Sequence, residues 1–189
     1  MKKQAGADEH AIVMSAVIHA IERVSRWCGG LAALLVFVLV VLMLYDVFMR
    51  YVFNAPTLWG FEVGTWTMGA AFVLSIGYAL ATDAHVRVDL LYGPRSRWIL
   101  SIVDLIFLPL LLVVAAWLTW GLWGYFSDGW RTGERSGGSA WNPKVWPFRL
   151  VLLVGFAAFT LQIVASILKT IARLRTGGPT EISTDGHGV

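Results

Sequence analysis

Four long apolar segments constrain this chain more than any other feature. They run from Trp27 to Phe48, from Phe61 to Ala81, from Trp98 to Phe126 and from Phe148 to Leu168. Each is long enough to cross the hydrocarbon core of a bilayer, which needs roughly 20 helical residues. Because that layer holds no water, a spanning backbone must satisfy its own hydrogen bonds, and a helix does so within one segment. The sequence therefore predicts an all-α integral membrane protein with four transmembrane helices.

The segments outside the spans are too short to bury a second core. We expect a flexible N-terminus over residues 1–9, an amphipathic interfacial helix over 10–28, a four-helix membrane domain over 29–173 and a disordered cytoplasmic tail over 174–189. The interfacial helix is predicted because apolar residues recur at helical spacing between Ala11 and Trp27. A continuous extension of the first span is the alternative. Gly29 and Gly30 are expected to supply the bend between surface helix and span.

Basic residues predict how the chain is oriented in the membrane. Of the 15 Lys and Arg residues, five would lie on the side of the first and third connections, and the other ten on the side of both termini. The five are Arg50, Arg131, Arg135, Lys144 and Arg149. Because cytoplasmic loops carry the excess of Lys and Arg, both termini are expected in the cytoplasm. The basic residues are scattered at span ends, which argues against nucleic-acid binding despite a pI near 9.2.

Residues that usually carry catalysis or bind metals and cofactors are few. Cys28 is the only cysteine, which excludes an intramolecular disulfide and a paired-thiolate metal site. The four histidines lie outside the spans, so they cannot hold a haem between helices, and the common hydrolase and nucleotide motifs do not occur. Asp83, His85 and Asp89 are the only candidate ligand group, and i,i+4 ion pairs explain them more simply. We expect no enzyme, no cofactor and no metal.

Polar residues at the turn between the first two spans are candidates for a structural role. Arg50 falls in the last turn of its helix, and Glu62 falls in the first turn of the next, so each complements its own helix dipole. Asn54 and Pro56 are expected to turn the chain between them. Only eleven residues separate Arg50 from Glu62, so we predict that both lie at the same membrane face and that their side chains pair. A role limited to the two dipoles is the alternative.

Small residues and tryptophans mark the remaining candidates. Gly69, Ser75 and Gly77 let helix backbones approach closely in lipid, so the second span is expected to be an interior helix or a subunit interface. Asn142-Pro143 and Trp146-Pro147 both look like helix starts, with Asn142 as a candidate cap and proline in the first turn. Four tryptophans should gather at the outer side, where interfacial anchoring is the simplest interpretation and contact with a periplasmic partner the alternative. They are Trp59, Trp130, Trp141 and Trp146.

The ordered combination of these residues resembles the small membrane subunit, or Q subunit, of tripartite ATP-independent periplasmic (TRAP) transporters. The similarity covers roughly residues 15–175. It is carried by Arg50 to Asn54, by Trp59 and Glu62, by His85, Arg87 and Asp89 with the two leucines that follow, and by Glu134, Trp141 and Trp146-Pro147-Phe148. One departure is Val63-Gly64, since many members of the family carry a second acidic residue after the position of Glu62.

The resemblance implies a DctQ-like small permease subunit of a bacterial inner membrane. Such a subunit binds a large membrane subunit, which carries the substrate and sodium sites, and enlarges the scaffold against which the transport domain moves. A periplasmic solute-binding protein delivers the solute, typically an organic acid. From the residues alone, two other classes stay open. One is a self-sufficient homo-oligomeric transporter or channel, and the other is a small membrane enzyme that uses the segment from Asp83 to Asp89.

Overall fold

Four helices form the structure, a computed structural model that describes residues 2–82 and 97–176. They are α1 (Lys2–Val52), α2 (Gly60–Ala81), α3 (Arg97–Thr132) and α4 (Trp146–Thr176). Each contains a stretch that is long and apolar enough to cross a membrane, as predicted from the sequence. The described residues form no strand, and an isolated antiparallel bridge joins Arg135 to Lys144 between α3 and α4.

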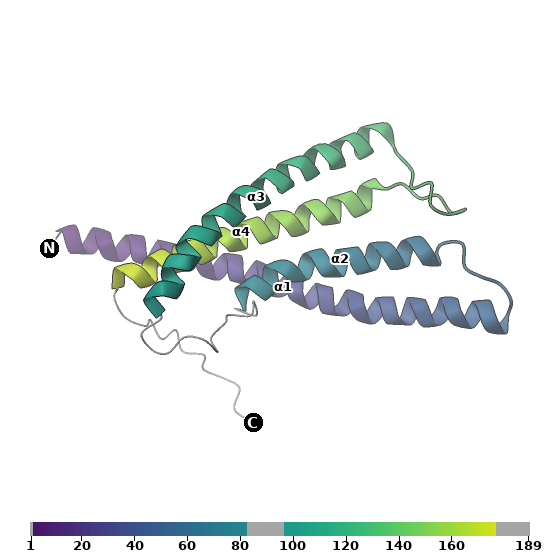
Figure 1. Ribbon diagram of the computed structural model, residues 1–189, viewed down its shortest axis with the longest axis horizontal. Coiled ribbons are helices and arrows are strands. Elements are labelled where there is room, and N and C mark those ends of the chain that lie inside the picture. The colour runs from purple at the N-terminus through teal and green to yellow at the C-terminus, as the bar shows by residue number, and fades with distance from the viewer. Residues whose placement is uncertain (1, 83–96, 177–189) are drawn as a thin grey trace, which may run out of the picture.

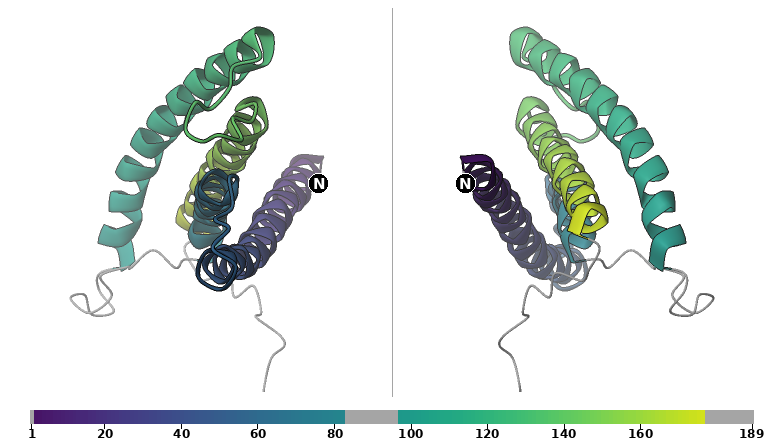
Figure 2. Two further views of the ribbon diagram at one scale, coloured as in Figure 1. Left: turned by 90° about the vertical axis from the view of Figure 1, so that its right-hand side faces the viewer. Right: turned by 90° about the vertical axis from the view of Figure 1, so that its left-hand side faces the viewer.

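The helices form an open layer in the order α1, α2, α4, α3 (Figures 1 and 2). α1 contacts α2 and α4, whereas α3, within the described part of the chain, contacts α4 alone. Figure 2 shows α1 and α3 at opposite edges, with α2 and α4 between them. The layer therefore does not close into a four-helix barrel around a lumen.

Small residues bring the two central helices together. Gly155 of α4 lies against the side chain of Val73 in α2, and Gly77 of α2 faces the backbone of Phe159 at ordinary contact distance, 3.6 Å from an added Cβ. Close approach of this kind is how helices associate in lipid, where apolar burial gives little drive. The second span is thus an interior helix, which was one of the two roles predicted for it. The other was a subunit interface.

α1 continues without a break through the two glycines that were expected to bend it. A Cβ at Gly29 would lie 2.5 Å from Cγ of Tyr78, so this glycine makes room for an α2 side chain, while Gly30 meets nothing. The helix is thus not interrupted at these glycines, where a bend was expected. Whether residues 10–28 lie along the membrane interface or extend the first span stays a prediction, and residues 177–189 of the expected tail lie outside the described residues.

The helix boundaries follow local chemistry. α1 ends at Val52, and Asn54 takes a left-handed φ of 52°, so that the amides of Phe53 and Ala55 both donate to the carbonyl of Met49. Asn tolerates this conformation better than most residues, which confirms the predicted turn. α4 begins at Trp146 with Pro147 in its first turn, as predicted, whereas the helix start predicted at Asn142 is wrong because no helix begins there.

Candidate functional site

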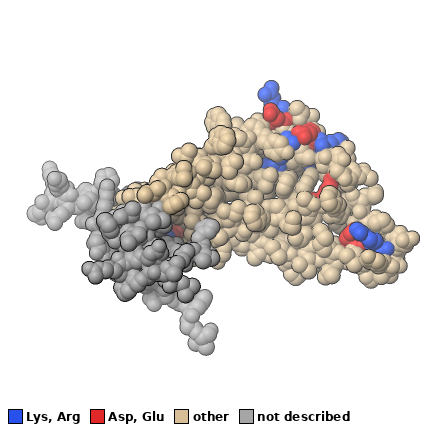
Figure 3. Space-filling model, in the orientation of Figure 1, with Lys and Arg blue, Asp and Glu red and all other residues tan. Residues whose placement is uncertain are grey.

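Polar residues concentrate at the end of the layer that carries the α1–α2 turn and the α3–α4 connection, which we call the outer end. On the face shown in Figure 3, most of the visible charged side chains lie there. Two groups can be distinguished. One surrounds Asp46 at the tip of the α1–α2 hairpin, and the other joins Glu62 and Arg149 to residues 133–145, which we call the outer loop.

At the hairpin tip, Asp46 fixes the turn. Its Oδ2 accepts a hydrogen bond from Arg50 at 2.6 Å, and its Oδ1 accepts from the backbone amide (3.3 Å) and the hydroxyl of Thr57. The predicted pairing of Arg50 with Glu62 is wrong, because Asp46 lies one helical turn before Arg50 and takes the guanidinium locally. Both residues do lie at the same end of the molecule, as predicted.

Glu62 ties α2 to the outer loop. The residue is 3% exposed, and its Oε1 accepts a hydrogen bond from the hydroxyl of Ser136. Its Oε2 has no hydrogen-bond partner among the described residues. The carboxylate also lies in the first turn of α2, where the helix dipole favours a negative charge, as the sequence indicated. A single buried acid thus connects two segments that are 74 residues apart.

Arg149 joins α3, α4 and the outer loop through one guanidinium group. Its Nη2 lies 2.7 Å from Oε2 of Glu134, its Nη1 donates to the carbonyl of Tyr125 at 3.0 Å, and its Cζ lies 3.6 Å from the centre of the Tyr125 ring. The residue is only 4% exposed. Sequence reasoning counted it only as a topology signal. A cation in the first turn of a helix is unfavourable for the dipole, and that conflict was the available sign of a specific partner.

The outer loop has a regular structure of its own. The amide of Ser136 donates to the carbonyl of Pro143 (3.0 Å), and the amide of Val145 donates to the carbonyl of Glu134 (3.1 Å). Asn142, with a φ of 46°, accepts a hydrogen bond from the amide of Gly137 through its side chain. The loop is therefore a short hairpin held to the helices by Ser136 and Glu134.

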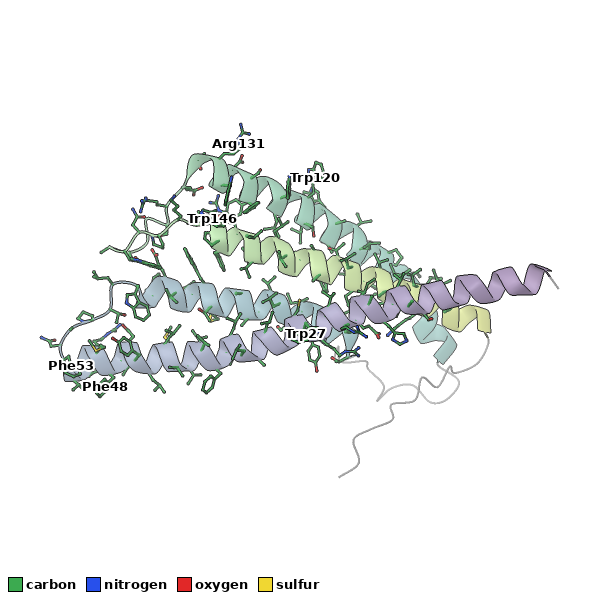
Figure 4. The ribbon with its side chains drawn as sticks, turned by 180° about the vertical axis from the view of Figure 1, so that it is seen from behind. Trp27, Phe48, Phe53, Trp120, Arg131 and Trp146 are labelled. Carbon is green, nitrogen blue, oxygen red and sulfur yellow. The ribbon has the colours of Figure 1, made fainter. Side chains whose placement is uncertain are left out.

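Aromatic side chains surround this end, as the sequence predicted. Trp130 and Trp146 contact edge to face with ring centroids 4.6 Å apart, and Trp59 stacks on Tyr45 at 6.0 Å. Trp141 belongs to the outer loop and is half exposed. Figure 4 places Trp146 at the outer end of α4, and Phe48 and Phe53 at the tip of the α1–α2 hairpin. Neither anchoring nor partner contact is decided by these positions, so both interpretations stay open.

A second polar group joins α1 to α4 toward the opposite end. Ser25 donates a hydrogen bond of 2.7 Å to the side chain of Gln162, and both residues are 1% exposed. Nearby, Lys169 pairs with Glu22. These pairs were not predicted, since 137 residues separate Ser25 from Gln162. The one available signal was a lone glutamine inside an apolar span.

The other predicted residues have structural surroundings or lie outside the described residues. Gly69 faces the ring of Phe148, where an added Cβ would lie 3.0 Å away, and Ser75 donates to the carbonyl of Phe72 in its own helix. His85, Arg87 and Asp89 fall in the undescribed segment 83–96. Among the side chains that the structure describes, those of residues 14–82 and 105–172, no three His, Cys, Asp or Glu gather closely enough to hold a metal ion. The polar side chains that the structure describes bond chiefly to one another. Their arrangement is that of residues that stabilise the fold.

Comparison with known proteins identifies the family. A profile described as "Tripartite ATP-independent periplasmic transporters, DctQ component" matches residues 39–173, from the second half of α1 through most of α4. No curated protein and no solved structure matches the chain. The profile covers well over half of the 189 residues and confirms the resemblance seen in the sequence. The chain therefore belongs to the DctQ family, the small membrane components of TRAP transporters.

Proposed function

We propose that the chain is the accessory subunit that binds the large membrane subunit of a TRAP transporter. In this role it supports sodium-coupled uptake of organic acids that a periplasmic solute-binding protein delivers. Membership of the DctQ family supports a place in the membrane part of such a transporter. The sodium coupling and the class of substrate are carried over from the family resemblance.

The bare edge formed by α3 is the observation that carries this proposal. α3 contacts α4 alone among the described helices, and only 6% of its most apolar stretch is buried. Trp117 and Trp120 are 74% and 77% exposed, and Figure 4 shows Trp120 pointing away from α4. Tryptophan is enriched at protein interfaces, where it often carries much of the binding energy. A layer left open on this side suits a larger partner that covers it.

The buried polar side chains support a scaffold better than a solute path. Transport pathways through a membrane are marked by polar residues along their length. In the described part of this chain, the buried polar side chains lie in separate groups, with Ser25 and Gln162 bonded to each other and Glu62 bonded to the outer loop. A homo-oligomeric transporter would need each copy to contribute a continuous polar path, and these groups do not form one.

We further propose that the protein lies in the bacterial inner membrane with both termini in the cytoplasm. The excess of Lys and Arg on the side of the termini supports this orientation. In a Cys28→Ala background, a membrane-impermeant thiol reagent added from outside should label Ser136→Cys but not Gly178→Cys. The reverse pattern would overturn the orientation.

The function itself is tested by assembly and transport. The tagged chain should copurify with a large TRAP membrane subunit coexpressed from the same organism, and Trp120→Ala should weaken that copurification more than Phe37→Ala. Phe37 is a matched control, because it is an exposed aromatic residue on the opposite edge. Liposomes that contain both subunits and the binding protein should take up an organic acid in a sodium gradient. Uptake by this chain alone would overturn the accessory role.

A further inference from the structure

A groove follows the α1–α2 hairpin toward its outer end. Its volume is about 480 Å³, within the range of ligand sites in proteins. Most of its wall is apolar, from Leu39 and Met43 on α1 and from Phe61 and Met68 on α2. Its outer end is polar, because Asp46 and Arg50 line it there.

Two glycines one helical turn apart bring α1 and α2 together along the groove. Gly64 lies against the end of the Met43 side chain, and a Cβ at Gly60 would lie 3.0 Å from Oδ1 of Asp46. Both glycines also line the groove, so the side chains of Met43 and Asp46 lie close against α2 there.

At the charged end of the groove, Arg50 has N–H donors without a partner among the described residues, while the neighbouring Asp46 already accepts hydrogen bonds. Asp46 already accepts hydrogen bonds from Thr57 and Arg50. The Arg50 side chain is 57% exposed, and among the described residues it bonds to Asp46 through one nitrogen only. Arginine has five N–H donors in a planar fork that suits phosphate. α1 ends two residues later at Val52, and its last carbonyls give that end a partial negative charge.

We propose that this groove binds a phospholipid with an ethanolamine headgroup. One acyl chain lies along the apolar walls, the phosphate meets the free donors of Arg50, and the ammonium group lies near the carbonyl end of α1. Because Asp46 and Arg50 together carry no net charge, the site gains little from a headgroup with net negative charge. The ammonium group donates hydrogen bonds to carbonyl oxygens, whereas the trimethylammonium group of a choline lipid has no N–H to donate. This inference is independent of assembly with a large subunit.

The headgroup contact is tested by lipid retention on the delipidated full-length chain, measured by native mass spectrometry. Phosphatidylethanolamine, phosphatidylcholine and phosphatidylglycerol with identical acyl chains are titrated separately. We expect the ethanolamine lipid to bind most tightly, and Arg50→Gln to weaken its binding roughly tenfold, since a charge-assisted hydrogen bond is lost. Arg131→Gln is the matched control, because Arg131 is an exposed arginine at the same end of the molecule and should leave binding unchanged.

The acyl-chain contact is tested by filling the groove from its rim. Thr65→Phe adds bulk there without disturbing a tertiary hydrogen bond, because the Thr65 hydroxyl donates to the Phe61 carbonyl of its own helix. It should reduce retention of the ethanolamine lipid, whereas Val113→Phe on the exposed face of α3 should not. Circular dichroism checks that each variant keeps its helices.

Three results would overturn the proposal. The first is equal retention of all three lipids by the parent chain. The second is ethanolamine-lipid binding that neither Arg50→Gln nor Thr65→Phe reduces. The third is a Thr65→Phe variant that binds lipid normally but no longer copurifies with the large subunit, since the groove would then receive a helix of that partner.

Discussion

The central helices α2 and α4 and the edge helices α1 and α3 use their apolar residues in different ways. One third of the most apolar stretch is buried in α2 and in α4, against 6% in α1 and in α3. Yet the most apolar stretch of α2 has the lowest mean hydropathy of the four, and that of α1 has the highest. In this chain the strength of the apolar signal therefore does not indicate which helix is inside.

Side-chain size explains the difference better than hydropathy does. Leucine gains little by leaving lipid for a protein interior, so helices associate where small residues allow close contact. α2 buries Gly64, Ala70, Ala71 and Gly77, whereas α1 exposes large side chains such as Phe37 and Leu44. The comparison predicts that added bulk is harmful at the centre and tolerated at the edges.

The largest expected effect comes from adding bulk between α2 and α4. Gly155→Leu should lower the free energy of unfolding by about 3 kcal/mol, at the upper end of overpacking effects, because a Cβ there already overlaps Val73 and its backbone lies within 3.4 Å. Gly121→Leu on α3 is the control, since nothing lies within 4 Å of that position. Unfolding in mixed detergent–SDS micelles measures both. Equal losses at the two sites would contradict the comparison.

The next effect concerns the polar contact that holds the edge helix α3 at its outer end. Arg149→Gln removes the charge-assisted bonds to Glu134 and to the Tyr125 carbonyl. It should lower the free energy of unfolding by about 2 kcal/mol. Glu134 is half exposed, so solvent screening limits how much its ion pair with Arg149 contributes to the free energy of unfolding. Arg131 is exposed at the outer end of α3, and Arg131→Gln should not measurably lower the free energy of unfolding. A cysteine at Ser136 that becomes no more reactive in Arg149→Gln would show that the arginine does not hold the outer loop.

Features set by neighbouring residues could be predicted from the sequence. The four spans and the turn at Asn54 depend on residue types within one or two helical turns. The α4 start at Trp146 and the interior position of α2 were each one of two predictions from such residues. Gly29 was misinterpreted for a related reason. A glycine in a helix can either bend it or admit a neighbour, and only the position of Tyr78 shows that it admits one.

Contacts between distant segments could not be predicted in the same way. Glu62 was expected to meet Arg50, but Asp46 is the nearer partner of Arg50, and Glu62 meets Ser136 in a loop 74 residues away. The bond between Ser25 and Gln162 depends on which helices are neighbours. Four apolar helices allow several orders in a layer, and their hydropathy does not choose among them. The polar site was therefore located only in part.

A smaller effect is expected where the other edge helix, α1, meets α4. Ser25→Ala leaves the buried side chain of Gln162 without its partner, and a double-mutant cycle with Gln162→Leu should give a coupling of about 0.6 kcal/mol, with about 1.7 kcal/mol as the upper bound seen for such bonds in membranes. The free energy of unfolding in mixed micelles is again the measurement. A coupling of zero would mean that the bond between Ser25 and Gln162 does not help to join α1 to α4.

The smallest effect is expected at the hydroxyl contact between α3 and α4. Oγ1 of Thr119 and Oγ1 of Thr160 lie 3.1 Å apart, but each also lies 2.8 Å from a carbonyl of its own helix, Ala115 and Phe156 respectively. Two hydroxyl groups have two protons for these three contacts, so at most one proton can serve the contact between helices. Thr119→Val keeps the shape and should change the free energy of unfolding by less than about 0.6 kcal/mol. Ala115 of α3 is buried in one hydrophobic cluster with Phe159 and Ile163 of α4. A loss well above that value would mean that a polar bond, rather than this packing, holds this edge of the layer.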